Sequence, residues 1–425
     1  MKNDHSERNI VITSKKTRAI SALVLTASLG VALAGCSASA DPSNSSAAGG
    51  DYTFWDPYPQ YDETSDWAKV IDACATEAGV SVTRTAYDTS DLTSKALLAG
   101  QQGSSPDILL IDNPVISTLA EAGILTTTDE NGLDVSNVEK NLISAGQSDG
   151  KTYGVPIGAN TLALYYNPEV LSAAGVDIAS VTDWASLTTA LEKVAAAGKK
   201  GITFSGIGTE EGSFQFLPWF WGSGAKLTEL DSSEAQSAVQ LWTDWVQKGY
   251  APNSVINNTQ TTSWQEFLTG DFAFAENGTW QKASAAEAGY EVIPIPAVDG
   301  GAAAAPTGGE FLSIPVQKDS ARYDASQKIV ACLTDTDNVV ASDNALNYIA
   351  PTEAAQQQQL ASDPTLKPWI DAVGEAQGRT GDNLGTDYPV ISEQLWTAVQ
   401  ASLTGSKSAA DALAEAQKSA AAGLK

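Results

Sequence analysis

DYTFWDPYPQYDETSDWAKVIDACATEAGVSVTRTAYDTSDLTSKALLAGQQGSSPDILLID, residues 51–112, alternates short apolar segments with amphipathic ones. The apolar segments have the composition of strands, and the stretches between them space their apolar side chains at helical intervals. The predicted strands are 52–55, 80–87 and 107–111, and the predicted helices are 65–78 and 91–101. This β-α-β-α-β order predicts a parallel sheet with helices on its faces.

The alternation continues through the rest of the chain. Further predicted strands are 152–156, 162–166, 201–204, 272–276, 291–295 and 311–315, and further predicted helices are 114–121, 184–197, 234–248, 264–268 and 407–422. The last helix is rich in alanine with lysine, aspartate and glutamate, and it is predicted to face solvent. About 375 residues follow the N-terminal segment, too many for one small core, so two α/β lobes are expected.

The first 35 residues are predicted to be a secretory leader. Basic residues precede an uncharged apolar run over 19–34, which is shorter than a membrane span of about 20 residues. Leu33-Ala34-Gly35-Cys36 is similar to the bacterial lipobox, which makes Cys36 the predicted lipidation site. An ordinary secretory signal is the alternative, but the small and polar residues of 36–50 suit a flexible tether. The predicted location is therefore the extracellular face of the cell membrane.

The chain is strongly acidic, with 24 Lys and Arg against 51 Asp and Glu and a formal net charge of −27. Without residues 1–35 the balance is 19 against 49, or −30. Such a charge repels nucleic acid and anionic lipid headgroups, so neither is an expected partner. The membrane is expected to be contacted through the lipid anchor alone.

The cysteines and the histidine restrict the chemistry. Cys74 and Cys332 lie in predicted helices, and in an exported protein a disulfide is favoured over two separate buried thiols. The one histidine, His5, lies in the leader, which argues against a His-based triad and a zinc site. A glycine-rich phosphate loop is absent, so ATP hydrolysis is expected of a partner. No cofactor and no metal are predicted.

Several motifs then resemble one family, the extracellular solute-binding proteins (family 1) of carbohydrate ABC importers, which includes maltose-binding protein. Phe267-Leu-Thr-Gly-Asp-Phe-Ala-Phe-Ala-Glu-Asn-Gly-Thr-Trp280 is the most specific, being similar to the family's F-x-x-G-x-A-A-x-x-x-x-G-x-W signature. The other similar segments are SPDILLID at 105–112, LAEAGIL at 119–125, YGVP at 153–156, LYYNP at 164–168 and GGEFLSIP at 308–315. Their order and spacing carry the resemblance from about residue 51 to the C-terminus.

The resemblance implies an α/β, two-lobe, periplasmic-binding-protein-like fold of type II. Several crossings form its hinge, and the ligand lies in the cleft between the lobes. The expected lobes are 51–159 with 310–366 and 160–309 with 367–425. The implied function is a monomeric, non-enzymatic binding protein that delivers a carbohydrate to the permease subunits of an ABC transporter.

A saccharide has an apolar C–H face that stacks on aromatic rings, and hydroxyls that need donors and acceptors. The chain holds 11 Trp and 12 Tyr, many of them beside polar residues in predicted loops. The candidate ligand-binding residues are Trp55, Asp56, Tyr58, Asp112, Asn113, Asn160, Trp219, Trp221, Trp280, Gly309, Glu310, Arg379 and Asp382. The resemblance gives Trp280 the role of stacking tryptophan.

Some of these residues have structural alternatives. Trp55 could cap a lobe core, and Asp112 or Asn113 could cap the next helix. Trp219 and Trp221 cannot both point one way on a helix, so one of them is expected in the core. Arg379 and Asp382 could form a surface ion pair. Trp184, Trp242 and Trp245, on inner helix faces, are predicted core residues.

The aromatic surplus favours a neutral carbohydrate, and an oligosaccharide over a monosaccharide because each added ring can stack again. A secreted glycoside hydrolase is one alternative, since such an enzyme needs two carboxylates placed across a bond and the chain is rich in carboxylates. A non-sugar solute on the same fold is another. Tyr165 and Tyr166 resemble the paired tyrosines of ferric-ion binders, although neighbours on a strand point to opposite faces. An amino acid or phosphate ligand would want an arginine, for which Arg379 is the candidate.

Overall fold

The computed structural model describes residues 51–380 and 384–424, all within one compact unit, Ala47–Lys425. The predicted leader, the tether and Cys36 lie outside the described residues, as does Asp382. Among the helices of the described ranges, none is long and apolar enough to cross a membrane.

The first sheet has five strands in the order β2-β1-β3-β11-β6. Its strands are β1 (Asp51–Asp56), β2 (Ser81–Ala86), β3 (Ile108–Asp112), β6 (Val155–Pro156) and β11 (Glu310–Ser313). β1 is parallel to β2 and β3, which confirms the predicted β-α-β-α-β unit. β11 enters from far along the chain and runs antiparallel between β3 and β6. The predicted strand at 152–156 is divided between β6 and a short hairpin of β4 (Gln147–Ser148) and β5 (Lys151–Thr152).

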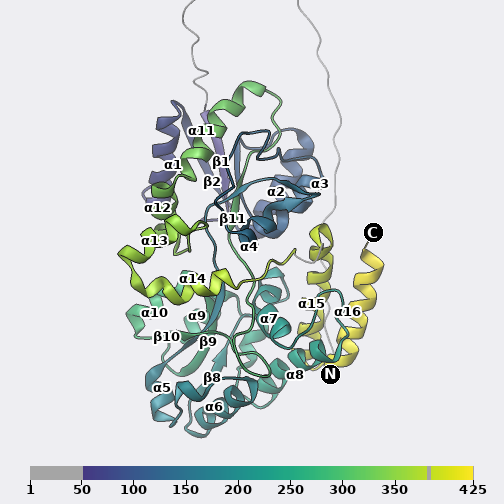
Figure 1. The fold of residues 1–425 in the computed structure, drawn as a ribbon. Coiled ribbons are helices and arrows are strands. Elements are labelled where there is room, and N and C mark those ends of the chain that lie inside the picture. Colours follow the sequence, from purple (N-terminus) through teal and green to yellow (C-terminus); the bar gives the residue numbers. More distant parts are fainter. Residues whose placement is uncertain (1–50, 381–383, 425) are drawn as a thin grey trace, which may run out of the picture. The chain divides into compact units, whose positions relative to one another are not determined.

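Helices cover this sheet, and Figure 1 shows α1 beside α11 and α12. They are α1 (Asp66–Glu77), α2 (Thr89–Gln102), α3 (Ile116–Glu121), α4 (Lys140–Ile143), α11 (Tyr323–Leu333), α12 (Thr336–Leu346) and α13 (Glu353–Ser362). Ser65 caps α1 by accepting a hydrogen bond from the backbone N–H of Ala68. A disulfide between Cys74 and Cys332, with Cα atoms 5.6 Å apart, joins α1 to α11. It is the pairing that the sequence favoured over separate thiols.

The second sheet has four strands in the order β10-β7-β9-β8. They are β7 (Leu162–Tyr166), β8 (Lys200–Thr203), β9 (Phe272–Gly278) and β10 (Glu291–Ile293). Every residue of β7 and β9 is buried, which explains the apolar sequence of β7 and of the first four residues of β9. The buried polar residues Glu276 and Asn277 follow them in β9. The surrounding helices are α5 (Pro168–Ala173), α6 (Trp184–Ala196), α7 (Glu210–Gly222), α8 (Ser233–Gln247), α9 (Gln260–Phe267), α10 (Lys282–Ala288), α14 (Lys367–Gly374), α15 (Tyr388–Leu403) and α16 (Ala409–Gly423).

An aromatic core lies beside the second sheet. Trp242 stacks on Phe204 with ring centroids 3.9 Å apart, and Trp245 meets Trp219 edge to face at 5.1 Å. Trp184 is also buried, so the predicted core positions of Trp184, Trp242 and Trp245 are confirmed.

The prediction that the terminal helix faces solvent is wrong for one of its sides. α16 packs against α15 and α8, as Figure 1 shows for α15. Its buried residues are Ala409, Ala412, Leu413, Ala416 and Ala420. These residues follow a helical spacing, and the small alanines allow close approach to the neighbouring helices. The charged residues of α16 occupy its other side.

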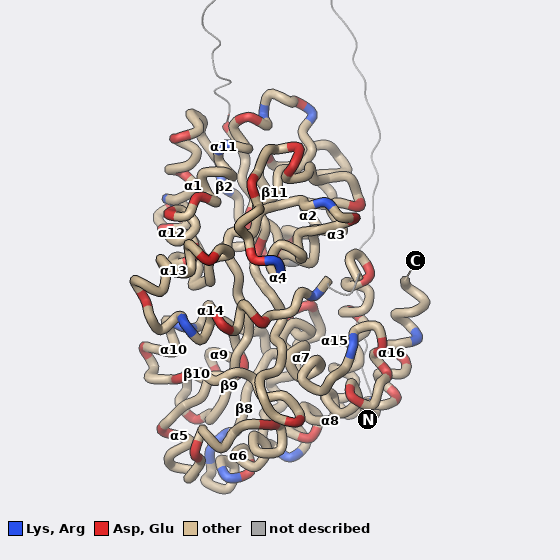
Figure 2. The backbone as a smooth tube through the Cα atoms, in the orientation of Figure 1, with Lys and Arg blue, Asp and Glu red and all other residues tan. Residues whose placement is uncertain are grey.

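Three chain segments connect the two sheets and pair with one another. Ala159 exchanges backbone hydrogen bonds of 2.7 and 2.8 Å with Ile349, while Asn160 bridges to Gly308. Gly309 has a φ of 112°, and a Cβ there would lie 2.5 Å from the carbonyl oxygen of Gly158, so glycine is required. The sheets follow the predicted division of the chain into two lobes, whose limits stay a prediction. Figure 2 shows acidic residues around both sheets.

Candidate functional site

A groove of about 600 Å³ lies between residues of the two sheets. On one side it is formed by the turn after β1, the end of β3 and the start of β11, and on the other by the start of α7 and by Trp280. Its lining residues are Pro57, Tyr58, Gln60, Tyr61, Asp88, Thr89, Asp112, Asn160, Ile207, Thr209, Glu210, Glu211, Phe214, Gln260, Thr261, Trp280, Gly308, Gly309, Glu310, Leu346, Tyr348 and Arg379. Five of these residues are aromatic and five carry a carboxyl group.

The first sheet places two carboxyl groups side by side at the groove. Asp112 is the last residue of β3, and Glu310 is the first residue of β11 and its register partner. Because directly opposed residues on antiparallel strands project to the same face, the two side chains are neighbours. Gly308 and Gly309, just before Glu310, bring the backbone itself to the groove wall.

Arg379 connects the two sides of the groove. It contacts Asp112 at two points, Nη2 to Oδ1 at 2.7 Å and Nη1 to Oδ2 at 3.3 Å, and Nη1 lies 2.8 Å from Oε1 of Glu210 at the start of α7. Burial alone would lower the pKa of Arg379, but Asp112 and Glu210 raise it above its usual value. The side chain is only 2% exposed, so the alternative of a surface ion pair is wrong.

Glu310 forms a second polar cluster with two tyrosines. The hydroxyl of Tyr58 donates a short hydrogen bond to Oε2, and that of Tyr348 lies 3.5 Å from Oε1. Burial, helped by the nearby Asp112, raises the pKa of Glu310 to about 8 against the lowering effect of the two tyrosines and Arg379. The carboxyl is therefore largely protonated at neutral pH.

Aromatic rings flank these charges. Trp280 is half-buried and lies 6.4 Å from Phe214 between ring centroids, with the planes 39° apart. A Cβ on Gly278 would lie 2.1 Å from Cζ3 of Trp280, which shows that the indole rests closely on this glycine. On the other side Tyr58 meets Tyr61 and Tyr348 edge to face. Rings next to hydrogen-bonding groups suit a ligand with both apolar and hydroxyl surfaces.

Most of the candidate residues come together in this groove. Tyr58, Asp112, Asn160, Trp280, Gly309, Glu310 and Arg379 all line it. Asn113 lies behind it, buried, with Nδ2 donating to the carbonyl oxygen of Thr307 at 3.0 Å and Oδ1 accepting from Arg379 at 3.3 Å. Asn113 therefore supports Arg379 from behind the groove. Ligand binding by these residues stays a prediction.

Asp56 and Trp55 do not line the groove, which corrects their assignment. Asp56 is fully buried, binds Arg84 and accepts a hydrogen bond of 3.1 Å from Nε1 of Trp67. Trp55 packs edge to face on Tyr87 at 5.4 Å in a core cluster of the first sheet. On a strand, successive side chains alternate between faces, and neither face of β1 at this point is open. The turn that follows brings Tyr58 to the groove instead.

Neither tryptophan of the aromatic helix α7 reaches the groove. Trp219 is wholly buried and donates Nε1 to Oε2 of Glu276 at 2.7 Å. Trp221 is half-buried and lines a second cavity of about 230 Å³ that includes Lys226 and Leu384 and shares Arg379 with the groove. The expectation that one of the pair is a core residue is met by Trp219, whereas Trp221 is not on the side of the helix that faces the groove.

The sequence analysis missed part of the groove wall. Glu210, Glu211 and Phe214 come from the first turns of α7, and Tyr348 comes from a crossing between the sheets. The sequence did contain a signal for α7. Two glutamates precede an aromatic run shortly after β8, and in an α/β fold binding residues are expected just after a strand ends. Tyr348 had no such local signal.

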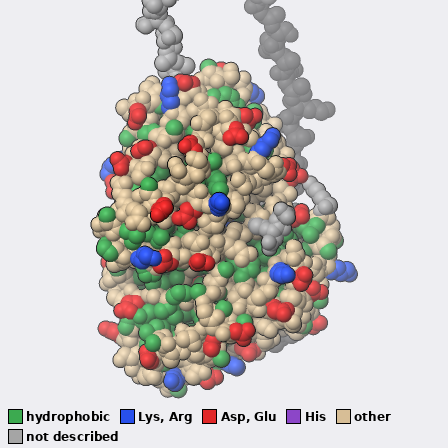
Figure 3. All heavy atoms as spheres, in the orientation of Figure 1, with side chains coloured by type: hydrophobic (Ala, Val, Ile, Leu, Met, Phe, Trp, Pro, Cys, Tyr) green, Lys and Arg blue, Asp and Glu red, His purple; other side chains and the backbone are tan. Residues whose placement is uncertain are grey.

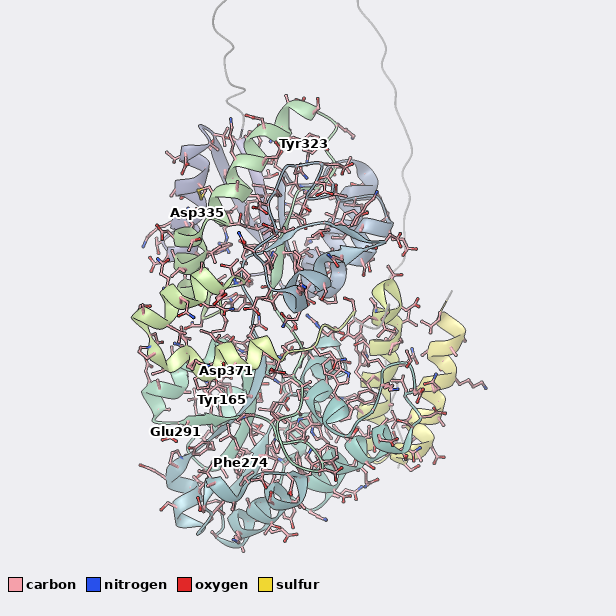
Figure 4. All side chains as sticks on the ribbon, viewed as in Figure 1. Tyr165, Phe274, Glu291, Tyr323, Asp335 and Asp371 are labelled. Carbon is pink, nitrogen blue, oxygen red and sulfur yellow. A yellow bond between two sulfur atoms is a disulfide. The ribbon has the colours of Figure 1, made fainter. Side chains whose placement is uncertain are left out.

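The alternative of a metal site on paired tyrosines is not supported. Tyr165, labelled in Figure 4, donates its hydroxyl to the carbonyl oxygen of Gly278 at 2.8 Å, and Tyr166 donates to Glu291. Both are buried beside the second sheet and neither lines the groove. In the described part of the chain, His, Cys, Asp and Glu form no group of three or more that could hold a metal ion.

Comparison with known proteins gives consistent matches. A family model described as bacterial extracellular solute-binding protein matches residues 69–368. A maltooligosaccharide ABC transporter solute-binding lipoprotein of Streptococcus pneumoniae is 27% identical over 314 residues, covering 69% of this chain and 71% of that protein. The maltodextrin-binding protein MdxE of Bacillus subtilis is 28% identical over 223 residues, 50% of this chain and 52% of its own.

The fold is also similar to a solved structure. The GacH receptor of Streptomyces glaucescens, determined unliganded and with acarbose, superposes with a TM-score of 0.74. The two chains are 24% identical, with 87% of this chain and 96% of the receptor covered.

Proposed function

The chain belongs to the bacterial extracellular solute-binding proteins, and from that premise we propose that it captures an oligosaccharide in the groove and delivers it to the permease of an ABC importer. As a member of this family it is the solute-binding component of an ABC transporter and not an enzyme. The identity of the solute is the part that goes beyond family membership.

One observation carries the saccharide proposal. The groove combines Trp280, Phe214 and Tyr61 with the acceptors and donors of Asp112, Asn160 and Arg379. Aromatic faces stack on the C–H side of a sugar ring, and carboxylate, amide and guanidinium groups pair with its hydroxyls. A groove of about 600 Å³ lies within the range of ligand sites and has room for more than one sugar ring. The named relatives bind maltooligosaccharide or maltodextrin, which supports the same class of ligand here.

The finer features of the proposal concern location and assembly. Lipidation of Cys36 and the tether at 36–50 would hold the protein at the extracellular face of the cell membrane, as in the lipoprotein relative of Streptococcus pneumoniae. We propose that it acts as a monomer in which two lobes, 51–159 with 310–366 and 160–309 with 367–425, close on the ligand. The permease subunits are its expected protein partners.

The test is a glycan array followed by calorimetry. Wild type is expected to bind one or more glycans, and Trp280→Ala is expected to weaken that binding by about 1–3 kcal/mol, the value typical of an aromatic stacking platform. Trp396→Ala is the matched control, since that partly exposed ring on α15 lines neither the groove nor the cavity of Trp221, and it should bind as wild type does. If no glycan binds while an amino acid or a metal ion does, the saccharide proposal fails.

A further inference from the structure

The groove holds many more acidic groups than basic ones. Five carboxyl side chains line it, Asp88, Asp112, Glu210, Glu211 and Glu310. Among the described residues of its lining, Arg379 is the single base. Figure 3 shows acidic side chains over the whole visible face, but there they are solvated, whereas Glu310 is 7% exposed. A buried carboxyl group ionises readily only when a cation or hydrogen-bond donors stabilise its charge, so this imbalance carries information about the ligand.

Arg379 does not correct the imbalance, because its charge is already shared. Its two terminal nitrogens contact Asp112 and Glu210, and its guanidinium lies 4.9 Å from the ring of Phe214. These two carboxylates outweigh one guanidinium. Among the described residues, Glu310 and Glu211 therefore line the groove without a cation of their own, and the backbone N–H of Gln260 donates a hydrogen bond to Glu211.

The contacts of Glu310 are organised for a carboxylate. The hydroxyls of Tyr58 and Tyr348 both face its oxygens, and because burial raises the pKa of both tyrosines, they keep their protons and act as donors. Burial and Asp112 oppose ionisation and hold the pKa of Glu310 at about 8. The hydrogen bonds thus favour the ionised form, which lacks only a positive partner. A carboxylate has room for one, since it can accept about four hydrogen bonds.

A second observation, at Arg379, indicates that the ligand also carries a hydrogen-bond acceptor. Nε of Arg379 is buried and has no hydrogen-bond partner among the described residues, and Arg379 lines the groove. A buried N–H without an acceptor costs about 1–3 kcal/mol, which a ligand oxygen would recover. A hydroxyl group supplies such an oxygen, whereas a simple polyamine has none to offer.

We propose that the solute is a saccharide that bears an ammonium group, as an amino sugar does, and that the ammonium pairs with Glu310 while a hydroxyl contacts Arg379. This inference rests on the proposed function and replaces the expectation of a neutral sugar with a more specific class. Anionic sugars are excluded by the same charge balance.

The experiment compares matched glycans that differ in one charge. The purified protein is screened on an array that carries glucosamine oligomers, the same oligomers N-acetylated, and neutral maltooligosaccharides. Calorimetry then measures the best amine-bearing glycan against its N-acetylated form. We expect the amine to bind at least about ten-fold more tightly, as a charge-assisted hydrogen bond would give. Binding at pH 7 should also release a proton from Glu310, detected as a dependence of the heat on the buffer.

The outcomes separate the two proposals. Binding of N-acetylated or neutral glycans that equals or exceeds binding of the amines overturns the ammonium inference and leaves the saccharide function standing. Binding of no glycan at all overturns the saccharide function. Binding of spermidine in place of any glycan overturns both, because it shows a cation site without saccharide recognition.

A variant identifies the carboxyl responsible. Glu310→Gln keeps the size of the side chain and removes its charge, so the affinity ratio between the amine and its N-acetylated form should fall toward one and proton release should disappear. Glu353→Gln, on the exposed start of α13 beside a different cavity, is the matched control and should preserve the ratio. An unchanged ratio in Glu310→Gln would overturn the assignment of the ammonium to this residue.

Discussion

Two arginine–aspartate pairs lie at the same edge of the first sheet and differ in how completely their polar atoms are partnered. Asp56 ends β1 and binds Arg84. Its oxygens also accept from the backbone N–H of Tyr58 at 3.0 Å and from Nε1 of Trp67, and Arg84 donates to two carbonyl oxygens, those of Tyr61 at 2.6 Å and Tyr58 at 2.7 Å. With Asp56 wholly buried and Arg84 7% exposed, this pair is closed to any ligand.

Asp112 ends the neighbouring strand β3 and binds Arg379 in the same two-point manner, but this second pair is open. Glu210 shares the guanidinium, Nε has no partner in the described chain, and Asp112 is 16% exposed at the groove wall. The two pairs have the same residue types and end neighbouring strands, yet one stabilises the fold and the other faces the groove. Residue type and position on a sheet therefore do not by themselves distinguish a structural ion pair from a ligand-binding one. The closed pair fixes the turn that carries Tyr58, and the open pair is left for a ligand to complete.

Breaking the closed pair should have the largest effect on stability. Arg84→Met leaves the carboxylate of Asp56 buried and without its cation, so a loss of about 3–5 kcal/mol in the free energy of unfolding is expected. Urea denaturation followed by fluorescence measures it. Lys328→Met, which removes an exposed pair with Asp324 on α11, is the control and should cost less than about 1 kcal/mol. Equal losses in the two variants would contradict the distinction between closed and exposed pairs.

The cluster beside the open pair should control how stability varies with pH. The pKa of Glu310 is raised to about 8 in the folded protein, against about 4.3 in an unfolded chain. Between these values the native state binds more protons than the unfolded state, so stability falls as pH rises. Wild type should lose on the order of 3 kcal/mol more than Glu310→Gln between pH 5 and pH 8. Parallel stability curves for the two proteins would show that Glu310 is not the titrating group.

The same pH experiment has three other contributors of the same sign. Burial raises the pKa of Glu211, Glu276 and Asp343, so each also favours the folded state at lower pH. Because all three remain in Glu310→Gln, the difference between variant and wild type isolates Glu310. Glu353→Gln, beside another cavity, should follow the wild-type curve.

Breaking the open pair should affect binding more than stability. Arg379→Met leaves Asp112 and Glu210 16% and 33% exposed, so water can solvate them and the loss of stability should be about 1–2 kcal/mol, well below that of Arg84→Met. Ligand affinity should fall at least about ten-fold in calorimetry, and Arg379→Lys should restore it only in part because an ammonium cannot span both oxygens. Full affinity in Arg379→Met would place the ligand elsewhere.

The smallest effect is expected next to the closed pair. Trp55 packs on Tyr87 and lies outside the groove, so Trp55→Leu should leave ligand affinity within about two-fold of wild type. Calorimetry with the same glycan as for Arg379→Met provides the measurement. A large loss of affinity with unchanged stability would mean that this ring contacts the ligand after all.

Local sequence patterns predicted most of the fold because they record which face of each element is buried. The prediction for β7, 162–166, matches the structure in both limits, and α1 and α6 agree within a residue at each end. The errors arise where contacts from outside the segment decide. The strand expected at 152–156 is interrupted because part of it pairs with β4 and part with β11. α5 and α10, which are short, were not predicted at all.

The candidate site was predicted less well because its composition resembles that of a core. Trp219 and Trp280 were both predicted to bind the ligand, yet one is sealed against Glu276 and the other lines the groove. Their surroundings are set by packing between helix and sheet. The motif that ends in Trp280 carried family information, which is why that residue was placed in the groove and the tryptophans of α7 were misplaced.

The sequence by itself determined the order of strands and helices, the acidic charge and the family, since each of these depends on neighbouring residues or on composition. It favoured a disulfide between Cys74 and Cys332, but the tertiary structure decided that pairing. Only the tertiary structure decided which Asp–Arg pair has partners for its polar atoms and which is open to the groove. Tyr58 meets Glu310 across 252 residues and Arg379 meets Asp112 across 267. Partners so far apart leave no periodic pattern in the chain, and whether a buried charge is satisfied depends on them alone.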